Sequence, residues 1–281
     1  MSIICDHVTY YYGKGTSDEV CALKDVSFQI KDGEYVGLIG HTGCGKSTLV
    51  QHLNGLLKAS SGHIYYNGAD IYDEDYRMKE LRGRVGLVFQ YPEHQLFEES
   101  VFKDVAFGPA NLGLSKSEAE LRSYEALKSV GLQDEYFYVS PFDLSGGQKR
   151  RVAIAGVLAL KPEVLILDEP TAGLDPEGRD EILGLVKRLH QEGITIILVS
   201  HSMEDVADNA GRVIVMDKGE ILMNGTPESV FTRIGDLEKI GLAAPGVTYI
   251  MHKLKERGIP VETGATTLDM AREEILRVFA G

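Results

Sequence analysis

The hydrophobic positions of the chain follow two different periods, and segments with each period alternate. Short apolar or β-prone runs bounded by turn residues predict strands. Segments with apolar residues at helical spacing predict helices. Strands are expected at Ile3–Tyr12, Val20–Ile30, Tyr35–Ile39, His63–Tyr66, Val85–Phe89, Val164–Leu167, Thr195–Val199, Arg212–Asp217 and Glu220–Asn224. Helices are expected from Lys46 to about Leu56 and at Val101–Asn111, Lys116–Val130, Gln148–Ala159, Pro176–Gln191, Met203–Ala210 and Thr267–Phe279.

This order predicts an α/β fold. Strands that alternate with helices imply a mostly parallel sheet covered on both faces. The opening segment is richer in strands, and Asn67-Gly68 is a strong hairpin signal between His63–Tyr66 and Ile71, so we expect an antiparallel β subdomain there. Residues from about 91 to 160 are mostly helical and predict a helical subdomain.

The composition changes beyond about Gly225. Thr226-Pro227-Glu228 has the features of a helix start: a capping threonine, proline at the first helical position, and an acid near the positive helix end. We therefore expect one large domain over residues 1–225 and a small α-rich C-terminal domain over residues 226–281.

Charge and composition narrow the setting in which the chain works. The formal net charge is −13, which argues against binding nucleic acid or an anionic bilayer through bulk electrostatics. Cys5, Cys21 and Cys44 form no C-x-x-C pair, which favours a reducing compartment and no zinc site. No signal peptide and no apolar run of the ~18–20 residues of a membrane span are evident. We expect a cytosolic chain that reaches a membrane only through a partner.

A glycine-rich loop carries the first chemical signal. Gly40-His41-Thr42-Gly43-Cys44-Gly45-Lys46-Ser47-Thr48 fits G-x-x-x-x-G-K-[ST] between a predicted strand and a predicted helix. Such a loop turns backbone N–H groups toward phosphate oxygens. Lys46 is expected to reach the β- and γ-phosphates, Ser47 to ligate Mg²⁺, and Thr48 to lie near the α-phosphate. The alternatives are a glycine turn that binds nothing, and a dinucleotide fold, whose G-x-G-x-x-G pattern is incomplete here.

Two acids follow a later apolar strand. In Val164-Leu165-Ile166-Leu167-Asp168-Glu169 we expect Asp168 to be associated with Mg²⁺, acting through bound water, and Glu169 to be the general base for an attacking water. The alternative is a pair of helix-capping acids before Pro170.

A second anion-binding sequence separates this chain from other phosphate-loop proteins. Leu144-Ser145-Gly146-Gly147-Gln148 opens a predicted helix, where Ser145, Gly146, Gly147 and Gln148 present donors at the positive end of the helix dipole. Two such sites on one chain are explained if two chains pack head to tail and each completes the other's nucleotide site. With both preceding motifs, over about Ile3–Gly225, the sequence resembles the ABC ATPase family, which implies ATP and Mg²⁺ as cofactors.

The resemblance implies further roles. Gln90 matches the Q-loop glutamine, which contacts Mg²⁺ and the attacking water and couples them to the membrane partner. Asp175 lies in the D-loop and also fits a helix cap. His201 matches the switch histidine at the γ-phosphate. Tyr12 matches the aromatic residue that stacks on adenine, although the surface of a strand is the alternative reading for this residue.

Within the family, several segments resemble the second of two related ATPases of energy-coupling factor (ECF) transporters. They are Tyr91–Glu99, Ala106–Pro109, Leu144–Gly156 and the C-terminal segment. The resemblance implies a heterodimer with a related ATPase, a transmembrane scaffold (T) subunit, an interchangeable substrate-capture (S) subunit for a vitamin or metal, and a place on the cytoplasmic face of the cell membrane. It also implies that the C-terminal domain contributes to contact between the ATPases.

The charged residues around these motifs lead to two hypotheses. Glu93, Glu98 and Glu99 follow Gln90, so we expect at least one to pair with an arginine of the scaffold subunit. Lys149-Arg150-Arg151 is expected to form a solvated or interface face of its helix.

Three other classes of protein are alternatives. An ABC-type DNA-repair protein needs a coiled-coil insertion or zinc modules, which the sequence lacks. A phosphate-loop kinase or GTPase has no need for the signature sequence. The ATPase of a conventional ABC importer or metal importer is distinguished only by the segment after Gln90 and the C-terminal domain.

Overall fold

The computed structural model describes residues 3–280 and is built around a six-stranded sheet in the order β10-β9-β3-β8-β7-β6. All neighbouring pairs are parallel except β9 with β10. Strands β3, β6, β7 and β8 are buried on both faces, which explains their unbroken apolar runs. The strands are β3 (Tyr35–Ile39), β6 (Val85–Val88), β7 (Val164–Asp168), β8 (Thr195–Val199), β9 (Arg212–Asp217) and β10 (Glu220–Gly225). The predicted α/β class is confirmed.

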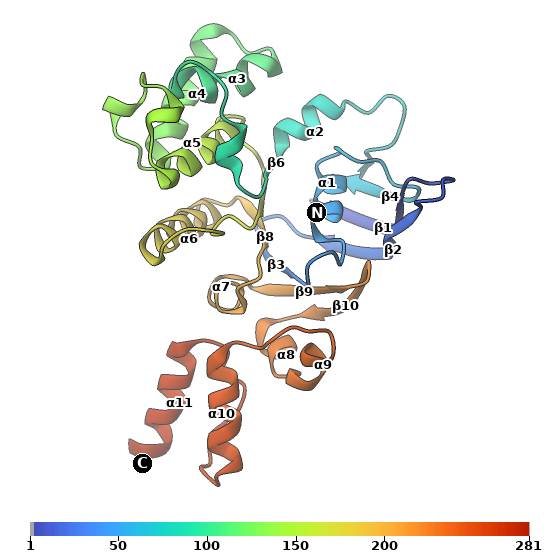
Figure 1. The fold of residues 1–281 in the computed structure, drawn as a ribbon, viewed down its shortest axis with the longest axis vertical. Coiled ribbons are helices and arrows are strands. Elements are labelled where there is room, and N and C mark those ends of the chain that lie inside the picture. Colours follow the sequence, from blue (N-terminus) through green and yellow to red (C-terminus); the bar gives the residue numbers. More distant parts are fainter. Residues whose placement is uncertain (1–2, 281) are drawn as a thin grey trace.

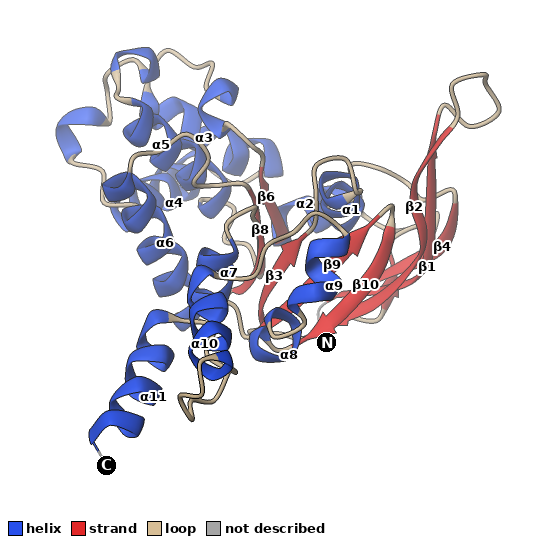
Figure 2. Cartoon of the chain, turned by 60° about the horizontal axis from the view of Figure 1, so that its bottom comes forward, coloured by secondary structure: helices blue, strands red, loops and turns tan. Residues whose placement is uncertain are grey.

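A second sheet is antiparallel and contains four strands in the order β2-β1-β4-β5. Its strands are β1 (Ile3–Tyr12), β2 (Val20–Ile30), β4 (Ser61–Tyr66) and β5 (Ala69–Asp70). One apolar core joins this sheet to the first helix, α1 (Lys46–Leu53), and to residues of the parallel sheet. Figure 2 shows it beside the parallel sheet. The predicted antiparallel β subdomain is therefore present, and its hairpin turns at Asn67-Gly68, although Ile71 lies beyond the end of β5.

A lobe of helices stands apart from the antiparallel sheet (Figure 1, upper left). It contains α3 (Val101–Leu112), α4 (Lys116–Ser129) and α5 (Gly146–Leu158), with the short turns η1 (Pro92–Gln95), η2 (Asp134–Tyr136) and η3 (Pro141–Asp143). A serine caps the N-terminus of each α-helix: Ser100, Ser115 and Ser145. The helix that carries the signature begins at Gly146, two residues before the predicted start.

Three more helices belong to the parallel sheet: α2 (Met78–Arg84), α6 (Pro176–Gln191) and α7 (Met203–Asn209). The sequence did not predict α2. Asp175 caps α6, as expected, by accepting a hydrogen bond from the N–H of Gly178 at 2.8 Å. Because β3, β6, β7 and β8 are parallel, the loops that leave their carboxyl ends meet at one edge of the sheet, where ligands of such folds bind.

The C-terminal segment contains α8 (Pro227–Phe231), α9 (Ile234–Lys239), α10 (Gly246–Glu256) and α11 (Leu268–Ala280), at the bottom of Figure 1. Thr226 caps α8 as predicted, accepting from the N–H of Ser229. The sequence did not predict α10, whose residues Val247 and Met251 form a small separate core with Val261, Ala265 and Ala271. Among the described residues, no helix is both long and apolar enough to cross a membrane.

Candidate active site

The glycine-rich loop joins β3 to α1 and closes around the Lys46 ammonium group. Lys46 is buried, and its Nζ donates hydrogen bonds to the carbonyl oxygens of Gly40 at 2.7 Å and His41 at 3.1 Å. Gly45 has φ +106°, and a Cβ there would lie 2.6 Å from the carbonyl oxygen of Ala22. Only glycine fits this position, since it meets both a left-handed backbone and a close neighbour.

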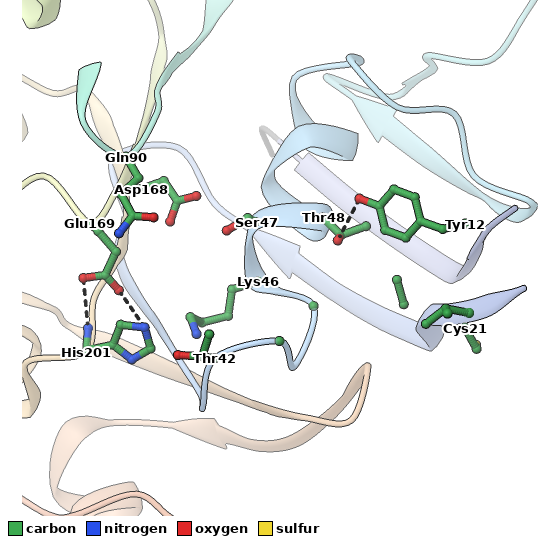
Figure 3. Close-up of a pocket in the computed structure, with 14 residues that line it drawn as sticks. Tyr12, Cys21, Thr42, Lys46, Ser47, Thr48, Gln90, Asp168, Glu169 and His201 are labelled. Carbon is green, nitrogen blue, oxygen red and sulfur yellow. Dashed lines mark hydrogen bonds and ion pairs between the residues drawn. The ribbon is translucent and has the colours of Figure 1, made fainter. Parts of the chain in front are cut away.

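A pocket of about 390 Å³ opens beside this loop, a size that suits a small-molecule ligand. The glycine-rich loop, the ends of the parallel strands and the antiparallel sheet all contribute to the pocket. Figure 3 shows Lys46 and Ser47 between an acidic side, with Asp168 and Glu169, and an aromatic side, with Tyr12. Its lining residues are Tyr12, Val20, Cys21, Ala22, Thr42, Gly43, Gly45, Lys46, Ser47, Thr48, Gln90, Asp168, Glu169 and His201. Residues widely separated in sequence are therefore assembled in one place.

Two carboxyl groups form the acidic side. Asp168 ends β7 and is buried, and burial raises the pKa of its carboxyl group while Ser47 and Lys46 partly offset the rise. Glu169 follows it with φ +52°, a left-handed conformation that is uncommon for a residue with a side chain. Burial raises the pKa of Glu169 to about 7, and the nearby Asp168 adds to the rise. A carboxyl group with that pKa can accept a proton near neutral pH.

His201 faces Glu169 from the end of β8. Its backbone N–H donates to Glu169 Oε2 at 3.4 Å, and its Nε2 lies 3.4 Å from Glu169 Oε1 (Figure 3). Burial and the Lys46 charge lower the pKa of the imidazole, so the ring is neutral at physiological pH. Glu169 Oε1 is buried without a hydrogen-bond partner in the described chain, so it is placed to accept from a water or a ligand.

Tyr12 lies on the opposite side of the pocket. Its hydroxyl and that of Thr48 are 3.2 Å apart, and its ring meets Tyr10 edge to face at 4.9 Å between centroids. Tyr10 in turn packs against His52 of α1, with 4.6 Å between the ring centroids. The Tyr12 ring is thus supported from behind yet 42% exposed, as a stacking surface requires.

Several predicted residues do not line this pocket. Cys44 is buried behind the loop, where its Sγ is 4.0 Å from Lys46 Nζ, and His41 Nε2 forms a hydrogen bond with Asp217 Oδ1 at 2.9 Å. Gly40 also lies outside the lining. The signature residues Ser145, Gly146, Gly147 and Gln148 lie in the separate helical lobe (Figure 1).

The signature serine and glutamine are engaged with each other. Ser145 Oγ accepts from the N–H of Gln148, and Gln148 Oε1 accepts from the N–H of Ser145 at 2.9 Å, which forms a capping box. Gly146 and Gly147 have open space where a Cβ would stand. The start of α5 therefore presents an open surface of backbone.

Sequence reasoning missed three pocket residues on β2. Val20, Cys21 and Ala22 line the pocket because β2 pairs with β1, with Val20 opposite Tyr12 and Cys21 opposite Tyr11. The signal that could have found them is this register, which follows once Tyr12 is placed at the end of a hairpin.

One sequence expectation is wrong. Lys149-Arg150-Arg151 is not uniformly a solvated face, because the Arg150 side chain is only 2% exposed. It pairs with Glu93, and Glu99 pairs with Lys103, so two of the three acids after Gln90 already have partners within the chain. A buried guanidinium needs a charged partner such as Glu93. Because Glu93 lies 57 residues away in the sequence, the local pattern around Arg150 does not predict this pair.

Comparisons with known proteins agree with the pocket and the fold. The sequence profile of the family described as "ABC transporter" matches residues 23–172. The chain is 55% identical over its whole length to the energy-coupling factor transporter ATP-binding protein EcfA2 of Caldanaerobacter subterraneus subsp. tengcongensis, covering 99% of that protein. It is 57% identical to the protein of the same name from Clostridium tetani, over 99% of this chain and 98% of that one.

Solved structures show the same architecture. CbiO1 from Clostridium perfringens, described as part of the ABC transporter complex cbiONQ, superimposes with a TM-score of 0.73 at 41% identity, covering 90% of this chain and 98% of that one. The ATP-binding cassette MJ0796, a dimer in a post-hydrolysis state bound to ADP and Pi, gives a TM-score of 0.71 at 31% identity, over 80% and 98%. The chain therefore belongs to the ABC transporter family as an ATPase, and within that family to the ATP-binding proteins of energy-coupling factor transporters.

Proposed function

We propose that this chain hydrolyses ATP across a head-to-tail ATPase dimer and thereby powers uptake of a micronutrient by an ECF-type transporter. The observation that carries the proposal is a division within one chain. The phosphate loop, Asp168, Glu169 and His201 share one pocket, while the signature at Leu144–Gln148 lies in another lobe with its glycines open. A nucleotide site completed by the signature then requires a second chain.

The donor set of the pocket suits a nucleotide with Mg²⁺. Ser47 and Asp168 would supply the oxygen ligands that Mg²⁺ prefers, with Asp168 acting through water, and Gln90, which lines the same pocket, would add an amide oxygen. Bound Mg²⁺ would neutralise charge on the β- and γ-phosphates. Lys46 and the loop N–H groups, including those of Gly43 and Gly45, would orient the phosphates, and Thr48 would lie near the α-phosphate.

Glu169 is the general base of the proposed reaction. It would take a proton from water through Oε1, the oxygen that lacks a hydrogen-bond partner, while the backbone N–H of His201 holds Oε2. The neutral His201 ring, which faces Oε1, would reach the γ-phosphate. Tyr12 would stack on adenine. Each residue thus acts on one part of the nucleotide, and the partner's signature helix covers the remaining face.

The segment after Gln90 is the proposed docking surface for the transmembrane scaffold. Phe97 and Phe107 are 58% and 49% exposed, and their rings meet at 5.1 Å between centroids, so an apolar patch stands beside Glu98 and Glu99. Docking there would place the chain on the cytoplasmic face of the membrane. Glu93 is largely buried against Arg150, whereas Glu99 is exposed in its pair with Lys103, so Glu98 and Glu99 are the acids proposed to meet a scaffold arginine.

The proposed partners follow from the relatives named for energy-coupling factor transport. They are a related ATPase, the scaffold subunit, and an interchangeable subunit that captures a vitamin or a metal. The second candidate function, the ATPase of a conventional or metal importer, is supported by the likeness to a component of the cbiONQ complex. Substrate choice would lie in another subunit in either case.

Co-purification of the full-length chain from its native membranes tests the proposal. The expected result is recovery of a related ATPase and a multi-span scaffold, with at least one small membrane subunit. Recovery with two membrane subunits and an extracellular binding protein would instead support a conventional importer. Reversal of the charges of Glu98 and Glu99 should release the scaffold, whereas the same change at Glu273, on α11, should not.

A further inference from the structure

Arg150 is a buried cation at a junction of three segments. It lies in the second turn of α5, the helix that begins with the signature, and its side chain is 2% exposed. Arginine is almost never buried to this degree without paired contacts, so the surroundings of this guanidinium define what it does.

The two ends of the guanidinium bind different segments. Nε and Nη2 donate to the two carboxylate oxygens of Glu93, at 3.2 and 2.9 Å, in a forked pair. Nη1 donates to the carbonyl oxygens of Pro170 at 3.0 Å and Ala172 at 2.7 Å. Arg150 therefore joins the turn after Gln90 to the backbone immediately after Glu169.

Both joined segments contain a residue in the left-handed region. Tyr91 has φ +53° two residues before Glu93, and Glu169 has φ +52° one residue before Pro170. The segments also approach each other directly, because a Cβ on Gly173 would lie 3.9 Å from the ring of Tyr91. Such backbone strain persists only where the surrounding contacts over-determine it, and four hydrogen bonds from one planar group provide that restraint.

We propose that Arg150 is a positioning residue for ATP hydrolysis: oriented by Glu93, it fixes the backbone at Pro170 and Ala172 and so keeps the strained turn that aims the Glu169 carboxylate. Movement of the turn that carries Glu93 is then transmitted through a rigid fork to the catalytic backbone. Arg150 does not line the pocket, so it acts through the backbone that carries Glu169 and not by contact with the nucleotide.

Lysine is the informative replacement. It keeps the positive charge and most of the side-chain length, but a single ammonium group cannot make a fork to Glu93 and reach two carbonyl oxygens at once. The matched control is Arg122→Lys. Arg122 also pairs with a glutamate, Glu118, but this pair lies within one helix, α4, and does not hold the backbone next to Glu169.

The experiment measures kcat, KM for ATP and the pH dependence of kcat for full-length Arg150→Lys, in the assembly in which the wild-type chain hydrolyses ATP. We expect kcat to fall about 10- to 100-fold with KM within about threefold of wild type, because the variant loses the orientation of the Glu169 carboxylate and not the binding of ATP in the ground state. The midpoint of the pH profile should move, whereas a change that only weakens packing leaves it in place. Arg122→Lys should leave kcat, KM and the midpoint unchanged.

Glu93→Gln provides an independent arm if Arg150→Lys does not fold. It keeps the shape of the partner and removes its charge, so kcat should fall about 3- to 10-fold with the same constancy of KM. Where both variants fold, the double variant should be no slower than Arg150→Lys alone, since both changes break one restraint. A kcat within twofold of wild type in Glu93→Gln or in folded Arg150→Lys overturns the proposal. The proposal is also overturned if Arg122→Lys lowers kcat as much as Arg150→Lys does.

Discussion

The two glycine-containing sequences of this chain have opposite surroundings. The loop at Gly40–Thr48 is wrapped around a buried lysine, has a strained glycine, and lies against Asp168 and Glu169. The signature at Leu144–Gln148 opens a helix with unobstructed glycines and a self-satisfied capping box. The loop therefore lies in a pocket that already contains the catalytic carboxyl groups. The signature presents exposed backbone N–H groups and lies outside that pocket. This difference is the basis for the proposal that the catalytic groups and the signature belong to different nucleotide sites.

The largest expected effect comes from removing the base on the catalytic side. Glu169→Gln should lower kcat about 10²- to 10⁴-fold and leave the affinity for ATP within about threefold, since the amide keeps the shape but cannot take a proton. Single-turnover ATP hydrolysis and equilibrium nucleotide binding measure the two effects. The assembly must carry the same change in its other ATPase, so that turnover there does not mask the loss. Rapid hydrolysis in that doubly disabled assembly would contradict the role of Glu169.

The pH dependence of kcat tests the role of Glu169 in the pocket of the phosphate loop. The raised pKa of Glu169, about 7, means that the carboxyl group is protonated below that value and cannot act as a base. We expect kcat to fall about tenfold for each pH unit below the midpoint and to level off above it. Burial and the Lys46 charge lower the pKa of His201, so the midpoint near pH 7 is assigned to Glu169 and not to this imidazole. A profile that is flat from pH 5 to 8 would contradict this assignment.

A smaller effect is expected at the aromatic end of the pocket. Tyr12→Ala should weaken nucleotide binding by about 1–3 kcal/mol, the usual worth of stacking a base on an aromatic ring. Tyr12→Phe removes only the contact with the Thr48 hydroxyl and should cost less than about 1 kcal/mol. Tyr65→Ala, on the neighbouring strand β4 and outside the pocket, serves as the control. Equal affinities for all three variants would show that Tyr12 does not stack on the base.

The sequence predicted the parts of the molecule that local pattern determines. The loop at Gly40–Thr48 and the strand ending in Asp168 are each a continuous stretch of sequence, and their residue types indicate phosphate and metal binding. The lining by Val20–Ala22 depends on the register of a hairpin, and the burial of Arg150 depends on Glu93 in another segment, so neither follows from spacing. Helix α10 escaped because it follows Pro245 without a side-chain cap and has few buried apolar positions.

The central claim is that the signature serves a nucleotide held by another chain, and Gly147→Asp tests it most directly. A Cβ added at Gly147 would meet no atom within 4 Å outside its own helix turn, so the fold should tolerate the change. A carboxylate at this helix start would repel a phosphate group. Gly235→Asp, also in a helix with open space, is the matched control. Sedimentation of the Glu169→Gln chain with its ATPase partner should show ATP-dependent association.

The account predicts that Gly147→Asp, added to both chains at their signatures, abolishes this association while each isolated chain still binds ATP with unchanged affinity. Gly235→Asp should preserve both association and binding. Loss of ATP binding by the isolated Gly147→Asp chain would contradict the account, because it would place the signature in the same site as the chain's own phosphate loop.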